Sequence, residues 1–74
     1  MIDNLTGLRV GDFLIDKHKI VEIVHITKKY VFTLKVIKII AHSGYKINSI
    51  FKISNINVCL FYNKLASFEK LKYL

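Results

Sequence analysis

Two stretches in the middle of the chain carry the residue pattern of β-strands. In the segment 20–27, six of eight residues are β-branched, and in the segment 30–36 the even positions are apolar. β-Branched side chains favour strands, and an alternation of period two places the apolar residues on one face of a strand. Only Thr27–Lys28–Lys29 connects the two segments, which is too short for a crossover. The sequence therefore predicts an antiparallel hairpin whose second strand continues to Ile40.

The apolar phase of that second strand changes along its length. Up to Val36 the even positions are apolar, whereas beyond it the odd positions are apolar, at Ile37 and Ile39, on either side of Lys38. A change of phase by one residue is what a β-bulge produces. We therefore predict a bulge near Val36–Ile37, of the kind that bends the strands of a small barrel.

Shorter strands are expected on either side of this hairpin. Gly11–Asp12 and Asp16–Lys19 bracket a strand over Phe13–Ile15. His42–Gly44 ends the hairpin, and the segment 45–54 alternates again, which predicts a fourth strand. One face of this fourth strand is expected to carry Ile47, Phe51 and Ile53, and the other Lys46, Asn48, Lys52 and Ser54.

The C-terminal third combines turn-forming, strand-forming and helix-capping residues. The segment 54–57 carries Ser and Asn side chains suited to a turn or a short 3₁₀ segment, and 58–62 is rich in strand-forming residues. We expect a fifth strand over 58–62. Asn63 could cap a final helix with an imperfect apolar stripe, and the alternatives are a sixth strand or a frayed tail. The stripe consists of Leu65, Phe68, Leu71 or Lys72, and Leu74.

Five short strands with tight connections predict an all-β domain built as a small barrel, with residues 1–74 forming one domain. The segment Leu8 to Ile15, "LRVGDFLI", followed by "KIVEIV", resembles the start of the SH3-like small-barrel superfamily, which includes KOW, Tudor and Sm-like modules. Gly11 can adopt positive φ in the turn, and Asp12 can accept backbone N–H bonds. The resemblance implies a barrel of about five antiparallel strands. It implies no functional residues, because the second glycine of a KOW motif and the N-terminal helix of an Sm-like protein are not found here.

The composition adds an excess of apolar residues. In 74 residues, 53% are hydrophobic, although a chain of this length buries only about 60% of its unfolded surface. Some apolar side chains should therefore lie on the surface, where a protein partner or a second copy of the chain could cover them. The single Cys59 excludes an intramolecular disulfide, and its apolar neighbours suggest a buried thiol.

Catalytic chemistry is poorly supported by the sequence. His18, His25 and His42 lie on different predicted elements, and Cys59 lies in an apolar one. There are no paired carboxylates, no phosphate-binding loop and no spacing typical of a metal site, so we expect no enzyme, no cofactor and no bound metal. The apolar runs are far shorter than the ~18 residues of a membrane span, and no signal peptide is evident. A cytoplasmic protein with no membrane partner is the expectation.

The charge points to an anionic partner. Twelve basic residues face five acidic ones, giving a net charge of +7. A field of this sign attracts nucleic acid, nucleoprotein or acidic protein surfaces. The leading hypothesis is nucleic-acid binding through a lysine-rich strand face, with aromatic rings stacking on bases. The alternative is that these lysines are an ordinary solvated face that protects a sheet edge. The candidate lysines are Lys28, Lys29, Lys35, Lys38, Lys46 and Lys52, and the candidate stacking rings are Tyr30 and Tyr45.

A second hypothesis is a protein-binding adaptor or inhibitor. The apolar excess and the C-terminal segment "LASFEKLKYL" suit a small protein that blocks a host factor, as phages and mobile elements encode. The positive charge would favour an acidic host protein as the target. The candidate contact residues are Phe68, Leu71 and Tyr73. A symmetric homodimer is compatible with either hypothesis.

Overall fold

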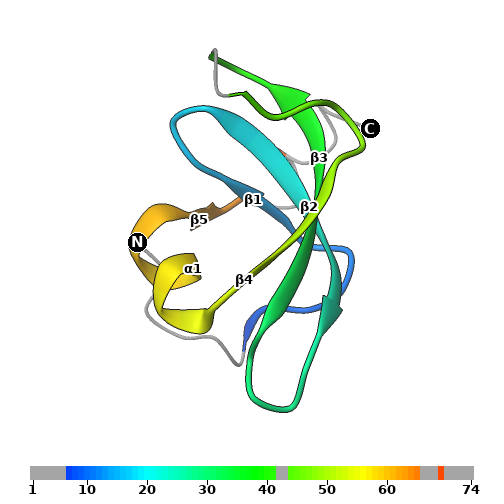
Figure 1. Ribbon diagram of the computed structural model, residues 1–74. Helices are drawn as coiled ribbons and strands as arrows, with labels where there is room; N and C mark the ends of the chain where they lie inside the picture. The colour runs from blue at the N-terminus through cyan, green and yellow to red at the C-terminus, as the bar shows by residue number, and fades with distance from the viewer. Residues whose placement is uncertain (1–6, 42–43, 66–68, 70–74) are drawn as a thin grey trace.

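The structure, a computed structural model, describes residues 7–41, 44–65 and 69. Within these residues it contains five strands and one short helix (Figure 1). In chain order the elements are β1 (Phe13–Ile15), β2 (Lys19–Ile26), β3 (Phe32–Ile39), β4 (Ile50–Ile53), α1 (Asn55–Phe61) and β5 (Asn63–Lys64).

The five strands form one sheet in the order β4-β3-β2-β1-β5, and every neighbouring pair is antiparallel. The first four strands follow one another as hairpins. Helix α1 then carries the chain from the β4 edge to the opposite edge, where β5 pairs with β1 (Figure 1). The predicted mostly antiparallel β-fold is thus confirmed, and the described residues contain five strands and one short helix. The sheet keeps two edges, at β4 and β5, and is not closed.

The predicted bulge lies where the phase of β3 changes. Val21 pairs with Val36 and Ile20 pairs with Lys38, which leaves Ile37 without an opposite residue. The prediction of a bulge near Val36–Ile37 is therefore confirmed. A second irregularity falls between Ile23 and His25 on β2. Bulges increase the local twist of a sheet, and the twisted β2–β3 hairpin spans much of the molecule in Figure 1.

The hairpin closes through the predicted short connection. The N–H of Tyr30 donates to the carbonyl of Thr27 at 3.0 Å, which forms a turn around Lys28 and Lys29. Tyr30 itself has φ of 57°, in the left-handed region. A turn followed by one left-handed residue is a common three-residue hairpin loop, although glycine usually occupies the last position. The packing of the Tyr30 ring against the core accounts for a tyrosine here.

The Gly11–Asp12 turn behaves as its residues predict. Gly11 has φ of 96°, and its N–H donates to the carbonyl of Ile23 at 2.8 Å. The carboxylate of Asp12 accepts the N–H of Arg9 at 2.9 Å. The turn therefore directs the chain into β1 alongside β2.

Apolar side chains pack on both faces of the sheet. On one face Leu14, Val21 and Val36 are fully buried in the larger cluster, which also includes Val58 of α1. On the other face a smaller cluster forms around Phe13 and Ile20. The bulge serves both clusters, since Val36 belongs to the larger one whereas Ile37 packs against the smaller one.

The predicted fifth strand over 58–62 is wrong, because this segment forms most of α1. Its buried residues are Val58 and Tyr62, which are four residues apart and therefore share one side of a helical turn. Asn63 does not cap a helix but begins β5. Cys59 is a free thiol on α1 and is only half-buried, so the prediction of a buried thiol in a strand is also wrong.

The fourth strand is shorter than predicted. Residues 45–49 do not belong to it, because Asn48 has φ of 70° and interrupts the extended chain. The N–H of Asn48 donates to the carbonyl of Val36, and the N–H of Val36 donates to the carbonyl of Ser49. Within β4 the predicted faces hold: Phe51 and Ile53 pack against the core, and Lys52 is exposed. Among the described residues, no helix has the length and apolarity needed to cross a membrane.

Candidate binding surfaces

The first residue of β2 is a lysine whose side chain turns into the molecule. Lys19 is only 5% exposed. Its Nζ lies 2.8 Å from Oδ2 of Asp16, and Oδ1 of Asp16 accepts the backbone N–H groups of His18 and Lys19, each at 2.8 Å. Asp16 thus closes the β1–β2 turn with one carboxylate oxygen and neutralises a buried ammonium with the other.

Three aromatic rings surround the same ammonium. Nζ of Lys19 lies 4.3 Å from the ring centroid of Tyr45, 5.5 Å from that of Tyr62 and 5.6 Å from that of Phe51. These distances are within the range of cation–π attraction, which is stronger when the cation is shielded from water. The Tyr45 and Phe51 rings also contact each other, with centroids 5.0 Å apart. We call Asp16, Lys19, Tyr45, Phe51 and Tyr62 the aromatic site.

The titrating groups of the aromatic site change one another's pKa values. Burial alone would raise the pKa of Asp16, but hydrogen bonds from Lys19 and from backbone N–H groups outweigh it and hold the pKa below its ordinary value. Burial alone would lower the pKa of Lys19, but its bonds to Asp16 and Tyr62 raise the pKa above its ordinary value. Burial raises the pKa of Tyr62, and Lys19 opposes that shift. At neutral pH the site therefore holds an ion pair and a neutral phenol.

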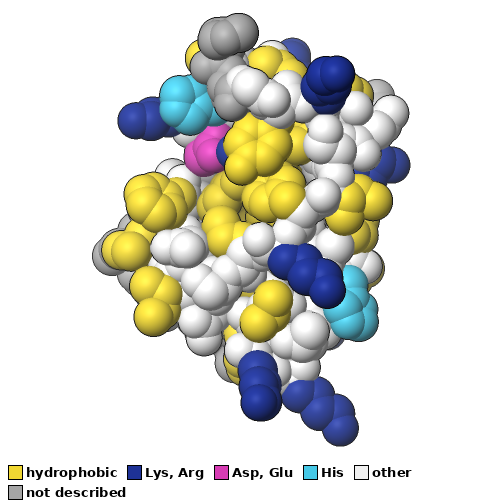
Figure 2. Space-filling model, viewed as in Figure 1, with side chains coloured by type: hydrophobic (Ala, Val, Ile, Leu, Met, Phe, Trp, Pro, Cys, Tyr) yellow, Lys and Arg dark blue, Asp and Glu magenta, His cyan; other side chains and the backbone are white. Residues whose placement is uncertain are grey.

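Two cavities open beside the aromatic site. The smaller, of about 320 Å³, is lined by Asp16, Lys19, Tyr45, Phe51, Lys52, Ile53, Phe61 and Tyr62. The larger, of about 740 Å³, is lined by Ile15, Asp16, Lys17, His18, Leu60, Phe61 and Asn63. Asp16 and Phe61 line both cavities, so the two adjoin. Figure 2 shows one face of the molecule. On this face, hydrophobic side chains gather beside one acidic side chain, and basic side chains lie around them.

The second surface is the outward face of β2, β3 and β4. Strand pairing aligns Glu22, Lys35 and Ile50 in one row across the sheet, and His25, Thr33 and Lys52 in the next. Lys35 and Lys52 are therefore diagonal neighbours on adjacent strands. Lys28 and Lys29 are exposed in the turn at the end of the same hairpin. We call Lys28, Lys29, Lys35 and Lys52 the lysine face.

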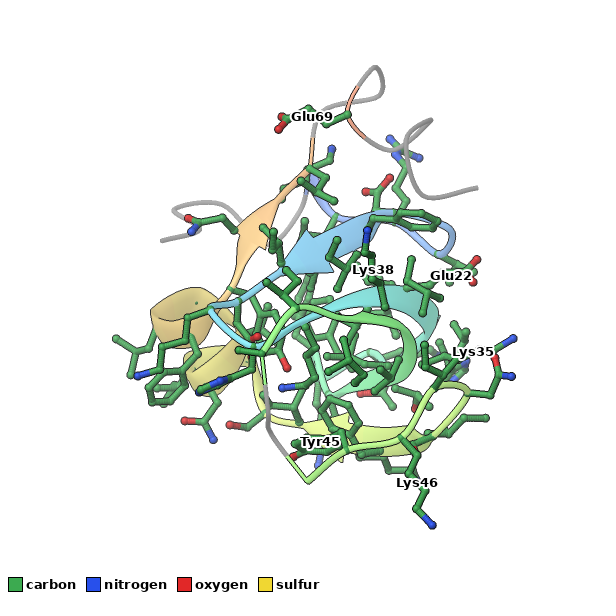
Figure 3. The ribbon with its side chains drawn as sticks, turned by 90° about the horizontal axis from the view of Figure 1, so that it is seen from above. Glu22, Lys35, Lys38, Tyr45, Lys46 and Glu69 are labelled. Carbon is green, nitrogen blue, oxygen red and sulfur yellow. The ribbon has the colours of Figure 1, made fainter. Side chains whose placement is uncertain are left out.

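The six predicted lysines lie in the β2–β3 turn, on β3, in the connection before β4 and on β4. Lys38 pairs with Ile20 beyond the bulge, and in Figure 3 Glu22 lies between Lys38 and Lys35. Lys46 lies in the connection before β4 and extends away from the ribbon in Figure 3, on the same side of the molecule as Tyr45. The pairing thus makes Lys35 and Lys52 diagonal neighbours and places Lys38 further along β3, beyond the bulge.

The predicted aromatic residues have different positions. Tyr45 belongs to the aromatic site and is partly exposed, whereas Tyr30 lies in the hairpin turn against the core. The candidate contact residues Phe68, Leu71 and Tyr73 lie outside the residues that the structure describes.

The sequence did not predict Lys19 as part of the aromatic site or Phe61 as a lining residue of both cavities. Lys19 was assigned to the turn between strands, and Phe61 to a strand. A signal for Lys19 was present, because it is three residues after Asp16 and has the same parity as Val21 and Ile23, which are buried on one face of β2. A period-two pattern thus placed its side chain inward.

Comparisons with known proteins assign the chain to no family: no family model, curated protein or solved structure matches it.

Proposed function

We propose that the chain is a non-enzymatic module that binds single-stranded nucleic acid, free or in a nucleoprotein. The observation that carries this proposal is the smaller cavity, in which Tyr45, Phe51 and Phe61 lie beside Lys52. Aromatic rings stack on bases of any sequence, and nearby lysines attract the phosphates. The structure thus combines the two kinds of group that single-strand binding requires.

The charge distribution supports an anionic ligand. Asp16 is paired with Lys19, and Asp12 lies 3.5 Å from Lys64. These two carboxylates are therefore balanced by nearby ammonium groups. Lys52 lines the cavity and also belongs to the lysine face. Because β4 is an edge strand, a strand of nucleic acid could contact the rings and pass around this edge to the lysine face with few opposing charges.

For the fold, we propose that the curved sheet forms a small barrel of the SH3-like class. The strand order supports this proposal, since α1 links the β4 edge to β5 at the other edge. The two irregularities in the β2–β3 ladder supply the bending that a barrel needs. A cytoplasmic site of action suits a nucleic-acid-binding protein with a free cysteine.

Fluorescence anisotropy with labelled oligo-dT and with a duplex of equal length tests the function. We expect the single strand to bind more tightly, and log K to fall with log salt with a slope of about −0.7 per phosphate contacted. Lys52→Gln should weaken binding more than Lys38→Gln. Both variants remove one exposed strand lysine, so they change the net charge equally.

Four results would contradict the proposal: no binding at low salt, affinity independent of salt, equal effects of the two lysine variants, or preference for the duplex. Equal effects would mean that net charge alone attracts the ligand. Preference for the duplex would exclude the stacking role of the aromatic rings, because paired bases do not expose their faces.

A second candidate function is binding of an acidic protein, and the exposed side chains of α1 favour it. Ile56, Leu60 and Phe61 are each more than half exposed on a helix of seven residues. Exposed apolar groups of this kind mark many protein interfaces. Retention of one protein from a nuclease-treated lysate, lost with Leu60→Glu but not with Lys52→Gln, would favour this function over the first.

A further inference from the structure

Phe61 separates the two cavities of the candidate surface, and this arrangement specifies how a ligand would lie. We propose that the cavities are neighbouring nucleotide subsites and that the Phe61 ring inserts between two consecutive bases of one strand. This inference rests on the proposed function and adds to it the position of each nucleotide. It also assigns a role to α1, which none of the predicted binding lysines occupies.

The backbone on both sides of Phe61 is fixed. Phe61 is the last residue of α1, and the N–H of Tyr62 donates to the carbonyl of Val58 at 3.1 Å. Val58 and Tyr62 are both buried in the larger core cluster. The next residue, Asn63, pairs with Ile15 in the sheet. The backbone of Phe61 is thus held in place between buried and paired residues, which lowers the conformational entropy that binding would cost.

The ring is also unusually accessible for a phenylalanine. Phe61 is 63% exposed, although it lies next to a core that could bury an apolar side chain. A ligand that covers both faces of the ring would remove that apolar surface from water. Because the ring lines both cavities, a base on each side would do so.

The two cavities suit different parts of a nucleotide. The smaller has three aromatic walls, Tyr45, Phe51 and Phe61, which are suited to stacking on a base. The larger has apolar walls in Ile15 and Leu60, and polar groups in Lys17, His18 and Asn63. Nδ1 of His18 is buried without a hydrogen-bond partner among the described residues, so a ligand here could supply one. Lys17 is exposed and can meet a phosphate.

The carboxylate between the cavities does not oppose this arrangement. Asp16 lines both cavities, but its oxygens accept bonds from Lys19 Nζ and from two backbone N–H groups. The negative charge is therefore compensated where the connecting phosphate would pass. Acidic side chains of a peptide would meet the same charges, but they have no flat rings to place on both faces of Phe61.

Calorimetric titration of the full chain with oligo-dT of one to six nucleotides, at low salt, tests the inference. Affinity should rise steeply from one to two nucleotides, as both subsites fill, and less steeply with each further nucleotide. Phe61→Leu keeps an apolar side chain but removes the ring, and we expect a loss of roughly 10- to 100-fold. Phe61→Trp should restore binding. The matched control is Ile56→Ala, since Ile56 is 67% exposed on the same helix but lines neither cavity.

A second measurement separates stacking from simple contact. In proton NMR spectra of the dinucleotide complex, thymine H6 and methyl signals should move upfield with the wild-type chain and much less with Phe61→Leu. Equal affinity of Phe61→Leu and wild type, equal losses for Phe61→Leu and Ile56→Ala, or unshifted thymine signals would overturn the inference and leave the proposed function standing. Failure of every oligonucleotide to bind the wild-type chain would overturn both.

Discussion

The aromatic site and the lysine face both depend on lysines of the same sheet, but these lysines have different surroundings. Lys19 is almost fully buried, with a carboxylate at 2.8 Å and three rings around its ammonium. Lys52 is exposed, and its neighbours across the sheet are a threonine and another lysine on the diagonal. The first lysine is held in one place by several groups at once, whereas the second remains in water.

The difference between the two lysines shows how burial changes the role of an ammonium group. An ammonium group loses its hydration when it is buried, so Lys19 is tolerable only because Asp16 and the rings replace the water. An exposed lysine needs no such partners and contributes little to stability. Lysines of the first kind should therefore control folding, and lysines of the second kind should control ligand binding.

The largest effect is expected from Lys19→Met. This change keeps most of the side-chain volume but leaves the carboxylate of Asp16 partly buried without its cation. We expect the free energy of unfolding to fall by about 3 kcal/mol, measured by urea denaturation. Lys35→Met, the control on the outward face, should change it by less than about 0.5 kcal/mol.

A double variant sharpens this comparison. Lys19→Met with Asp16→Asn leaves no unpaired charge, so part of the lost stability should return. If the double variant were as unstable as the sum of both single changes, the ion pair would not be the cause. In that case the packing of the lysine stem would be more important.

A smaller effect is expected from Tyr62→Phe, which keeps the buried ring and removes the hydroxyl that interacts with Lys19. Loss of one such hydrogen bond should lower the free energy of unfolding by about 1 kcal/mol. The same change should cost less in the Lys19→Met background. Equal costs in both backgrounds would show that the hydroxyl and the ammonium are not coupled.

The aromatic site should also limit stability at both ends of the pH range. The pKa of Asp16 is lowered on folding, so its contribution is present above its unfolded value of about 3.9 and is lost as pH falls through the folded value. The pKa values of Lys19 and Tyr62 are raised, so stability should also fall above about pH 10. Thermal melts from pH 2 to pH 11 test this, and Asp16→Asn should flatten the acid limb. An unchanged acid limb in that variant would assign it to other carboxylates.

The smallest effect is expected on the lysine face, from Glu22→Gln. Glu22 is directly opposite Lys35 and brings a negative charge to an otherwise basic surface. The carboxylate of Glu22 and a ligand phosphate about 8 Å away in water would repel each other by about 0.5 kcal/mol. Removing this repulsion should tighten oligo-dT binding roughly twofold. Anisotropy titrations at low salt measure it. Weaker binding would mean that Glu22 orients Lys35 for the ligand.

Much of the sheet could be predicted because apolar and polar side chains alternate along its strands. Phe13–Ile15 was predicted at its observed bounds, and the phase change at Val36–Ile37 revealed the bulge. The helix α1 could not be predicted from residue preference, because Val58, Phe61 and Tyr62 favour strands in general. Their spacing contained the better signal, since Val58 and Tyr62 are one helical turn apart.

The aromatic site could be predicted only in part. The residue types of the lysines and of Tyr45 were evident, but the partners of Lys19 come from the β1–β2 turn, the chain before β4, β4 itself and the end of α1. Such a set assembles only when strands far apart in sequence are paired. In the same way, the strand register decided that Lys35 lies beside Lys52 and that Lys38 does not.

The bulge at Ile37 has a consequence for how the length of the chain could vary. Ile37 and Lys38 lie opposite the single residue Ile20, so removing Ile37 would leave Val36 and Ile39 on the sides they now occupy. Removing Thr33 instead would turn every later residue of β3 to the wrong face. A deletion at the bulge should therefore cost the contact of Ile37 with the smaller cluster but keep the strand register, whereas a deletion a few residues before it should disrupt the register, which makes β3 adjustable in length at one point along its course.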